Sequence, residues 1–323
     1  MAEAKSSAAK PAALVAGQSL EGYAYFRGKI MPLAEATISI ATHALHYGTG
    51  VFEGIRAYYS KEEDQLYCLK LREHYERMQN SCRIIRINLG LSTDELCEIT
   101  LEMLRANQFR EDVYIRPIAF KASTGIGLKL TGLEDAFAVY AFPIGEYLDT
   151  TKGLHCMVAS WFRPEDNSMP VRAKLCGAYV NSCLASDDAK LNGFDEANQL
   201  TQDGHVSEGS SCNLFLVRNG QIITSPVSDA ILEGITRSTI LTLARDLGYE
   251  TVERKIDRTE LYIADELFFV GTGVQVAPIT RVDHRPIGDG RAGKITLHIQ
   301  ESYFKAVRGH DPRYRDWLTP VYV

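Results

Sequence analysis

The chain has 323 residues, of which 45% are hydrophobic and 24% charged, and its net charge is −6. This composition is typical of a globular protein with a sizeable core, and the length favours two domains. The acidic balance, without any long basic run, argues against nucleic acid as a partner, and no apolar stretch is long enough to span a membrane.

Cysteines and histidines limit the metal and redox chemistry. The seven cysteines are scattered and form no CxxC pair, which indicates reduced thiols in a cytoplasmic protein. His43 and His46 are spaced closely enough to share a metal. No third ligand stands near them in the sequence, so we interpret both as packed or hydrogen-bonding residues and expect no metal.

The first part of the chain predicts a flexible tail followed by a small mixed domain. Residues 1–18 are rich in Ala and Ser and form the expected tail, and residues 19–146 form the expected domain. Its predicted elements are a hairpin around Arg27–Lys29, a short strand in GIRAYYS, a helix from Arg72, a helix from Ser92 with Glu95 completing a capping box, and strands in DVYIRPIAFKAS and DAFAVYAFPIG.

The second part predicts a larger domain after a polar stretch, GEYLDTTKG. We place an interdomain linker at 147–153 and the larger domain at 154–323. Its predicted elements are a strand in LHCMVASWF, a helix YVNSCLASDDAKLNG ending at Gly193, hairpins at Asp203-Gly204 and Asn219-Gly220, a helix ITRSTILTLARDLG, a strand–turn–strand in ELFFVGTGVQVAPITRV, and a closing helix ITLHIQESYFKAV.

A glycine-rich stretch near the C-terminus raises the alternative of a nucleotide-binding protein. GDGRAG, at 288–293, fits GxGxxG and is close to a P-loop. The preceding HRPI is no buried strand, and Ile295 stands where a P-loop needs Ser or Thr. Too little chain follows for a βαβ unit. We interpret the stretch as a loop that enters the last helix.

Lys174 lies among small and apolar residues in VRAKLCGAYVNS, with no other charged residue between Arg172 and Asp187. A lysine that is held in place and partly desolvated can form Schiff bases with carbonyl compounds, including pyridoxal phosphate. Small neighbours such as Gly177 and Ala178 would let a flat ring approach the backbone. The alternative is a lysine whose head group simply reaches solvent.

Pyridoxal phosphate also needs a carboxylate beside its ring nitrogen, and amides, hydroxyls or an arginine around its phosphate. Glu208 lies in a small-residue, strand-like stretch, Thr236 in the first turn of a helix without acidic residues, and Thr272 between two glycines. Arg72 opens a helix, where a nearby anion would explain a cation. Each feature alone is equally compatible with an ordinary surface glutamate, helix start or hairpin.

Taken together, these segments resemble the branched-chain aminotransferases, which are fold type IV pyridoxal-phosphate enzymes. The matching stretches are THALHYGTGVFEGIRAYY, LREHYERM, VYIRPIAF, AKLCGAYVNS, VSEGSSCNLF, EGITRSTI, ADELFFVGTG and GRAGKIT. The resemblance implies an α+β, two-domain fold, with a small α/β N-terminal domain and a larger, β-barrel-like C-terminal domain. It also implies a cofactor in the cleft between the domains, and a homodimer in which the partner supplies part of each pocket.

The resemblance also implies a set of site residues. Lys174 would be the Schiff-base lysine, Tyr179 the partner of the cofactor's phenolic oxygen, and Glu208 the partner of its ring nitrogen. The phosphate would be held by Arg72, Ile235, Thr236 and Thr272, and the ring would pack against Leu232. The substrate's α-carboxylate would meet Tyr114 and the amides of Thr272 and Gly273; the second carboxylate of glutamate would meet Arg116, Tyr47 and Tyr147; and Phe52 would line the side-chain pocket.

The implied activity is transfer of the amino group of L-leucine, L-isoleucine or L-valine to 2-oxoglutarate, and the reverse, in two half-reactions. Lys174 would serve as general base and then acid. The chain departs from many relatives at 176–178, 210–212 and Ile144, which keeps open an (R)-selective amine or D-amino acid transaminase as the alternative. The pair Tyr114 and Arg116 favours the branched-chain group, and the apolar pocket disfavours an aminodeoxychorismate-lyase-like activity.

Overall fold

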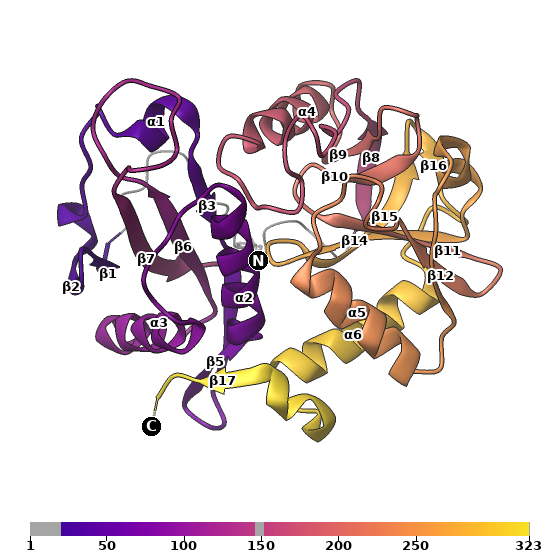
Figure 1. The fold of residues 1–323 in the computed structure, drawn as a ribbon. Helices are drawn as coiled ribbons and strands as arrows, with labels where there is room; N and C mark the ends of the chain where they lie inside the picture. Colours follow the sequence, from indigo (N-terminus) through magenta and orange to yellow (C-terminus); the bar gives the residue numbers. More distant parts are fainter. Residues whose placement is uncertain (1–20, 146–151, 323) are drawn as a thin grey trace, which may run out of the picture.

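A computed structural model describes residues 21–145 and 152–322. Two sheets dominate it, and Figure 1 shows them side by side, with helices packed around each. The first sheet is antiparallel, the second also contains the parallel pairs β8·β9, β8·β15 and β12·β13, and the combination of these sheets with separate helices confirms the predicted α+β class. Within the described residues, no helix combines the length and the apolar character that a membrane crossing needs.

The first sheet has eight strands, with β17-β5-β4-β6-β7-β1-β2 in order and β3 paired to β6, all antiparallel. The strands are β1 (Tyr23–Phe26), β2 (Lys29–Pro32), β3 (Gly50–Phe52), β4 (Ile55–Ser60), β5 (Gln65–Leu69), β6 (Val113–Lys121), β7 (Asp135–Pro143) and β17 (Leu318–Pro320). Helices α2 (Leu71–Ile84) and α3 (Thr93–Asn107) bury their apolar faces in one core cluster with this sheet. The short elements η1 (Leu33–Glu35) and α1 (His43–Tyr47) lie between the hairpin and β3.

The second sheet has nine strands, with β10-β9-β8-β15-β14-β11-β12-β13 in order and β16 paired to β15. The strands are β8 (Leu154–Val158), β9 (Glu196–Leu200), β10 (Val206–Gly209), β11 (Asn213–Arg218), β12 (Gln221–Thr224), β13 (Thr251–Glu253), β14 (Glu266–Gly271), β15 (Gln275–Val282) and β16 (Arg285–Pro286). Around it lie α4 (Tyr179–Leu191), α5 (Ile235–Asp246), α6 (Lys294–Val307), η2 (Arg258–Ile263) and η3 (Pro312–Trp317).

Several local predictions are confirmed. The side chain of Ser92 accepts from the Glu95 N–H, and Glu95 accepts in return from the Ser92 N–H, so α3 begins with the expected capping box. The β1–β2 hairpin turns through Arg27 and Gly28, both with positive φ, as a two-residue hairpin requires. Helix α4 ends before Gly193, whose φ of 80° is the left-handed conformation expected after a helix.

The two sheets share a core. Tyr58, Tyr67 and Leu69 of the first sheet belong to the same buried cluster as the apolar faces of α5 and α6. The C-terminal strand β17 returns to pair with β5, the lower strand in Figure 1. Residues 318–320, at the end of the predicted larger domain, therefore belong to the first sheet. The linker at 147–153 stays a prediction, because residues 146–151 lie outside the described part.

The GDGRAG stretch forms the expected loop into the last helix. Gly293 is the N-cap of α6, and the preceding strand β16 is only two residues long and exposed. The carboxylate of Glu266 accepts from the N–H groups of Ile295 and Thr296, at 3.0 and 2.7 Å. Because these amides already donate to the carboxylate of Glu266, this helix start does not offer free N–H donors to a phosphate.

Candidate active site

A cavity between the two sheets gathers most of the residues proposed to hold the cofactor. Its wall includes Lys174, Tyr179, Glu208, Leu232, Ile235, Thr236 and Thr272. Arg77, Arg163 and Asn213 also line it, although the sequence analysis did not single them out.

Lys174 projects into this cavity from the loop before α4. Its Nζ donates to the Tyr179 hydroxyl at 2.5 Å and lies 5.0 Å from the centre of the Phe52 ring. The first sheet holds the lysine backbone, since Phe52 N–H donates to Lys174 O at 3.1 Å, and Lys174 N–H donates to Ser81 Oγ of α2 at 3.2 Å. The backbone of Lys174 is therefore held by the first sheet and α2, and its half-buried amine is held by the Tyr179 hydroxyl.

The glycine after this lysine has a different role from the one expected. Gly177 lies against Gly48, whose Cβ, if present, would be 2.6 Å from Gly177 Cα. Gly48 also has a φ of 62°, which favours glycine. The two residues thus allow the loop that carries Lys174 to pack directly on the backbone that follows α1.

Glu208 lies on β10, buried against the cavity. Its carboxylate accepts from Arg163 at 2.9 Å, from Asn213 Nδ2 at 2.8 Å and from the Leu232 N–H at 3.2 Å. Burial raises the pKa of Glu208, and the Arg163 guanidinium opposes that rise. The site therefore holds a buried carboxylate that would gain from a cationic N–H donor entering the cavity.

The first turn of α5 offers an anion site. Its first intrahelical bond runs from Ser238 N–H to Gly234 O, which leaves the amides of Ile235, Thr236 and Arg237 without an intrahelical acceptor. No acidic residue lies in this turn and no side chain caps it. In contrast to α6, this helix start lies at a cavity, so it suits a phosphate.

The structure corrects the assignment of Arg72 as a phosphate ligand. Arg72 lies in the first turn of α2, its side chain is 55% exposed, and it pairs with Asp94. Arg77, on a different face of the same helix, lines the cavity instead. The side chains of His74, Arg77 and Ser81 recur at intervals of three and four residues, and this polar helical stripe is the pattern that could have identified Arg77 from the sequence.

Arg77 is held by a buried acid. Its Nε and Nη2 donate to the two oxygens of Glu53 at 2.7 Å each, and its Nη1 donates to Glu233 O at 2.9 Å. His74 Nδ1 lies 2.7 Å from the same carboxylate. Burial alone would raise the pKa of Glu53, but Arg77 and His74 outweigh it and hold that pKa well below its usual range. Burial lowers the pKa of His74, against the opposing effect of Glu53.

Arg116, the residue expected to bind the substrate's second carboxylate, is not among the residues that line the cavity, but it contacts Phe52, whose ring also lies near Lys174 Nζ. Its guanidinium carbon lies 4.6 Å from the centre of the Phe52 ring, and its Nη2 donates to the Tyr114 hydroxyl at 3.2 Å. Arg116 Nε is buried and has no hydrogen-bond partner. Only glycine fits at position 54, where a Cβ would collide with the Tyr114 hydroxyl. Phe52 and Tyr114 thus form an aromatic surface beside Arg116, whose guanidinium keeps one N–H without a partner.

Two further predicted residues, Tyr47 and Gly273, are not among the residues that line the cavity. Tyr47 is in α1, where its hydroxyl accepts from the Gly127 N–H at 3.1 Å, and it is not among the residues that line the cavity. Gly273 follows Thr272 in the β14–β15 turn. Tyr147 falls outside the described residues. His43 bonds to Thr49 Oγ1 and Gly127 O, both at 2.8 Å, as a packed histidine does.

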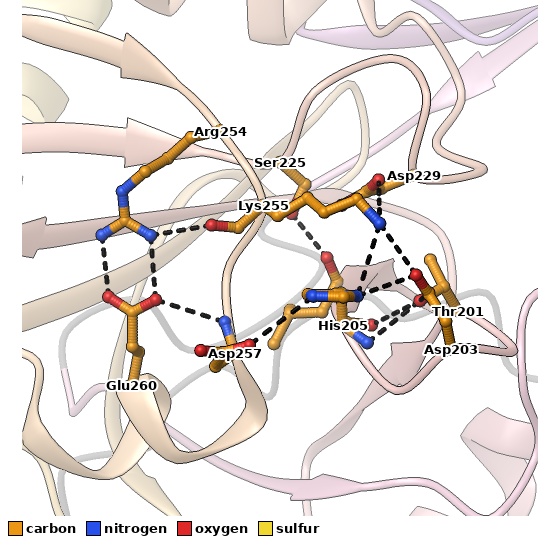
Figure 2. Close-up of polar contacts among 10 residues, drawn as sticks. Thr201, Asp203, His205, Ser225, Asp229, Arg254, Lys255, Asp257 and Glu260 are labelled. Carbon is orange, nitrogen blue, oxygen red and sulfur yellow. Dashed lines mark hydrogen bonds and ion pairs between the residues drawn. The ribbon is translucent and has the colours of Figure 1, made fainter.

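A surface network supports the segment behind Glu208 (Figure 2). Lys255 Nζ lies 2.8 Å from Asp203 and 3.9 Å from the buried Asp229, and His205 lies 3.0 Å from Asp203. Ser207 Oγ donates to Asp229 O at 2.6 Å. The network therefore ties the loop that leads to Leu232 to the strand that carries Glu208.

Comparison with known proteins agrees with this geometry. The family model for class IV aminotransferases matches residues 50–282. A probable branched-chain-amino-acid aminotransferase of Aquifex aeolicus is 50% identical over 301 residues, covering 93% of this chain and 97% of the relative. A branched-chain aminotransferase of Thermoproteus uzoniensis, solved with norvaline, superposes with a TM-score of 0.90 at 43% identity, over 94% of this chain and all of the other.

A second solved structure shows the kind of ligand that such a cavity takes. The branched-chain amino acid aminotransferase of Thermobaculum terrenum, solved in its PLP-bound holo form, has a TM-score of 0.90 and 37% identity, over 95% of this chain and all of that one. These matches span both sheets and the cavity between them. The chain therefore belongs to the class IV aminotransferases, and within them to the branched-chain amino acid aminotransferase family.

Proposed function

We propose that this protein transfers the amino group of L-leucine, L-isoleucine or L-valine to 2-oxoglutarate, and catalyses the reverse reaction, with pyridoxal 5'-phosphate as cofactor. The observation that carries the proposal is the cavity itself, which joins the amine of Lys174, the buried carboxylate of Glu208 and the open start of α5. The relatives described above are branched-chain enzymes, which favours this activity over an (R)-selective amine or D-amino acid transaminase.

The cavity residues fit the cofactor chemically. The amides of α5, the Thr236 and Thr272 side chains and Arg77 supply donors for a phosphate, while Glu208 supplies an acceptor for a ring N–H. Leu232 provides an apolar surface for the ring. When bound, the cofactor supplies an electron-poor ring that takes up the electron pair left at the substrate Cα.

In this proposal, the protein's own residues transfer the Cα proton and stabilise the charge on the cofactor's ring nitrogen. Lys174 Nζ, freed when the amino acid binds, would remove the Cα proton as a base and deliver a proton to the cofactor as an acid, and it would carry out the same transfer in the opposite direction in the second half-reaction. The Tyr179 hydroxyl, 2.5 Å from that amine, orients it. Glu208 keeps a proton on its ring partner, since a buried carboxylate in this setting stabilises an adjacent cationic N–H.

The substrate side must accept both an apolar side chain and a second carboxylate. Phe52 and the Tyr114 ring suit the apolar side chains of leucine, isoleucine and valine. Arg116, whose Nε has no partner, would bind the second carboxylate of glutamate or 2-oxoglutarate. The same pocket can thus accept either substrate class: the aromatic rings contact an apolar side chain, and Arg116 binds the second carboxylate of an acidic substrate.

We propose further that the protein is a homodimer. Ile40, Leu45, Ile126 and Leu128 of α1 and its neighbouring loops are between 61 and 93% exposed. An exposed apolar set of this size is typical of an interface. Tyr47 lies in the same region and does not line this chain's own cavity, so we propose that it contributes to the partner's pocket. Tyr147 remains a proposed ligand of the second substrate carboxylate.

A cytoplasmic location is supported by the thiols. All seven cysteines lie within the described residues and are free, and six of them are buried or half-buried. Proteins that keep this many unpaired cysteines usually work in a reducing compartment.

The experiment that tests the function is a donor panel with purified protein, pyridoxal 5'-phosphate and 2-oxoglutarate. We expect L-leucine, L-valine and L-isoleucine to form glutamate, and D-alanine and (R)-1-phenylethylamine to react slowly or not at all. Turnover of only the D- or (R)-donors would make the proposal wrong while leaving the fold intact. Borohydride reduction followed by peptide mapping should place the cofactor label on Lys174, and Lys174→Ala should lose it.

A further inference from the structure

The loop between β12 and α5, residues 225–234, carries several groups that the cofactor needs. Leu232 and Gly234 line the cavity, and the loop ends at the open start of α5. The Leu232 N–H donates to Glu208 at 3.2 Å, and the Leu232 carbonyl accepts from Asn213 Nδ2 at 3.0 Å. The conformation of this loop therefore decides both the apolar wall for the ring and the position of the phosphate site.

The middle of the loop has a strained backbone. Ala230 has a φ of 56°, a left-handed conformation that is unfavourable for residues other than glycine, and it is buried. Its carbonyl accepts from Arg163 Nε at 3.3 Å, and the carbonyl of Asp229 accepts from Ser207 Oγ at 2.6 Å. Because strained backbone persists only where its surroundings hold it, the loop depends on the contacts of Ala230 and its neighbours.

The Asp229 side chain places a buried acid in the same loop. It is only 2% exposed, its Oδ1 accepts from Ser228 Oγ at 3.4 Å, and its Oδ2 has no hydrogen-bond partner among the described residues. Burial raises the pKa of Asp229, and the nearby Lys255 and His205 oppose that rise. A buried carboxylate with so few hydrogen bonds needs a nearby cation to stay ionised.

Lys255 supplies that cation from the segment that follows β13 (Figure 2). Its Nζ lies 3.9 Å from Asp229 Oδ1 and donates to Asp203 Oδ2 at 2.8 Å. Asp203, between β9 and β10, also accepts from Thr201 Oγ1 at 2.5 Å, which fixes the lysine head group beside the loop. At 3.9 Å the contact with Asp229 is an ion pair without a hydrogen bond, so Lys255 gives this carboxylate a charge and not a directed bond.

Building on the proposed function, we propose that Lys255 is a positioning residue for the cofactor. By neutralising Asp229, it keeps the strained loop closed, and so keeps Leu232 and the start of α5 at the cavity. This contribution is largest when Lys174 is free, since the cofactor is then held by non-covalent contacts alone. Without the charge of Lys255, the Asp229 carboxylate gains hydration by moving outwards, and the loop follows it.

The test measures how tightly the protein retains pyridoxamine 5'-phosphate, a form of the cofactor that has no aldehyde to bond with Lys174. Ultrafiltration of the loaded protein gives the dissociation constant, and release after dilution gives the rate. Lys255→Met removes the charge, Lys255→Arg keeps it, and Lys255→Met combined with Asp229→Asn removes both charges. Arg254→Met is the matched control, because it breaks the ion pair of the neighbouring residue with Glu260 and no contact of Asp229.

We expect Lys255→Met to raise the dissociation constant and the release rate about 5- to 50-fold, the effect of leaving a buried polar group without its partner. Lys255→Arg and the double variant should stay within about threefold of the wild type, because the first keeps the neutralising charge and the second removes the need for it. Arg254→Met should lower the thermal midpoint of unfolding without weakening retention.

Unchanged retention in Lys255→Met overturns the inference, and so does an equal loss in the double variant or in Arg254→Met. If Lys255→Met does not fold, Lys255→Gln replaces it with the same expectation. A wild-type protein that retains pyridoxamine 5'-phosphate but leaves L-leucine unreacted refutes the proposed activity, while the comparison of the variants still decides the role of Lys255. A wild-type protein that does not bind pyridoxamine 5'-phosphate overturns both.

Discussion

The pair Glu53 and Arg77 allows a quantitative test of how the cavity is built. Glu53 is fully buried and accepts two short bonds from Arg77. Each bond to a charged group contributes about 1.5–3 kcal/mol, and removing one member of a buried pair costs about 3–5 kcal/mol. We therefore expect Glu53→Gln and Arg77→Met each to lower the unfolding free energy of the apoprotein by about 3–5 kcal/mol.

The double variant decides whether the two residues act as a pair. Because neither charge is then left alone, it should cost about as much as one single change, a departure from additivity of about 3 kcal/mol. Urea unfolding of the four apoproteins measures this. Additivity to within about 0.5 kcal/mol would refute the reasoning.

The same variants test the proposal that Arg77, which lines the cavity, is a phosphate ligand. Arg77→Met should weaken pyridoxal 5'-phosphate binding by about 10- to 150-fold, the value of one charge-assisted hydrogen bond. Arg72→Met, on an exposed face of the same helix, is the matched control and should change neither binding nor stability by more than about 0.5 kcal/mol. Absorbance titration of the apoproteins measures both, and a larger loss in Arg72→Met would restore the sequence-based assignment.

Three other changes extend these expectations. His74 has a lowered pKa in the fold, so it contributes stability above pH 6.5 that is lost as the pH falls. In urea unfolding, His74→Asn, which keeps a donor towards Glu53, should therefore reduce the change of the unfolding free energy between about pH 6.5 and 5. An unaltered pH dependence would count against this role of His74. Glu208→Gln should lower kcat about 100-fold or more while the cofactor still binds, and near-normal turnover would remove Glu208 from the mechanism. Lys255→Met should lower the thermal midpoint of unfolding but leave KM for L-leucine unchanged, and a raised KM would show that the network of Figure 2 reaches the substrate.

Several residues that the sequence singled out, and that the structure places at the cavity, lie in short motifs with local chemistry. Lys174, in the loop before α4, is five residues from Tyr179, the first residue of that helix, and Thr236 lies in a helix start that no side chain caps. Glu208 and Asn213 are likewise five residues apart across a tight turn between strands, although Asn213 was not singled out. In such cases the chain itself brings the groups together, so the pattern of residue types is informative.

The phosphate ligand shows where local pattern fails. Arg72 and Arg77 lie on one helix and differ only in the face that each occupies. Which face meets the cavity depends on Glu53, a residue of the loop between β3 and β4, and on the backbone of Glu233, which is 156 residues away from Arg77. An arginine near a helix start therefore does not identify a phosphate ligand when the partners that orient its side chain come from other elements.

The sequence by itself determined the α+β class and most helix and strand positions, because capping, alternation and small-residue spacing act over a few residues. It also singled out Lys174 and Glu208, which the structure brings to one cavity. Only the tertiary structure decided which arginines serve the cavity, that the C-terminal strand closes the first sheet, and that Arg56 on β4 donates to the carbonyl of Thr272, 216 residues away. Such contacts depend on how the two sheets pack against each other. Because a buried charge is costly without a partner, each arginine bonds to the acceptors that this packing places beside it.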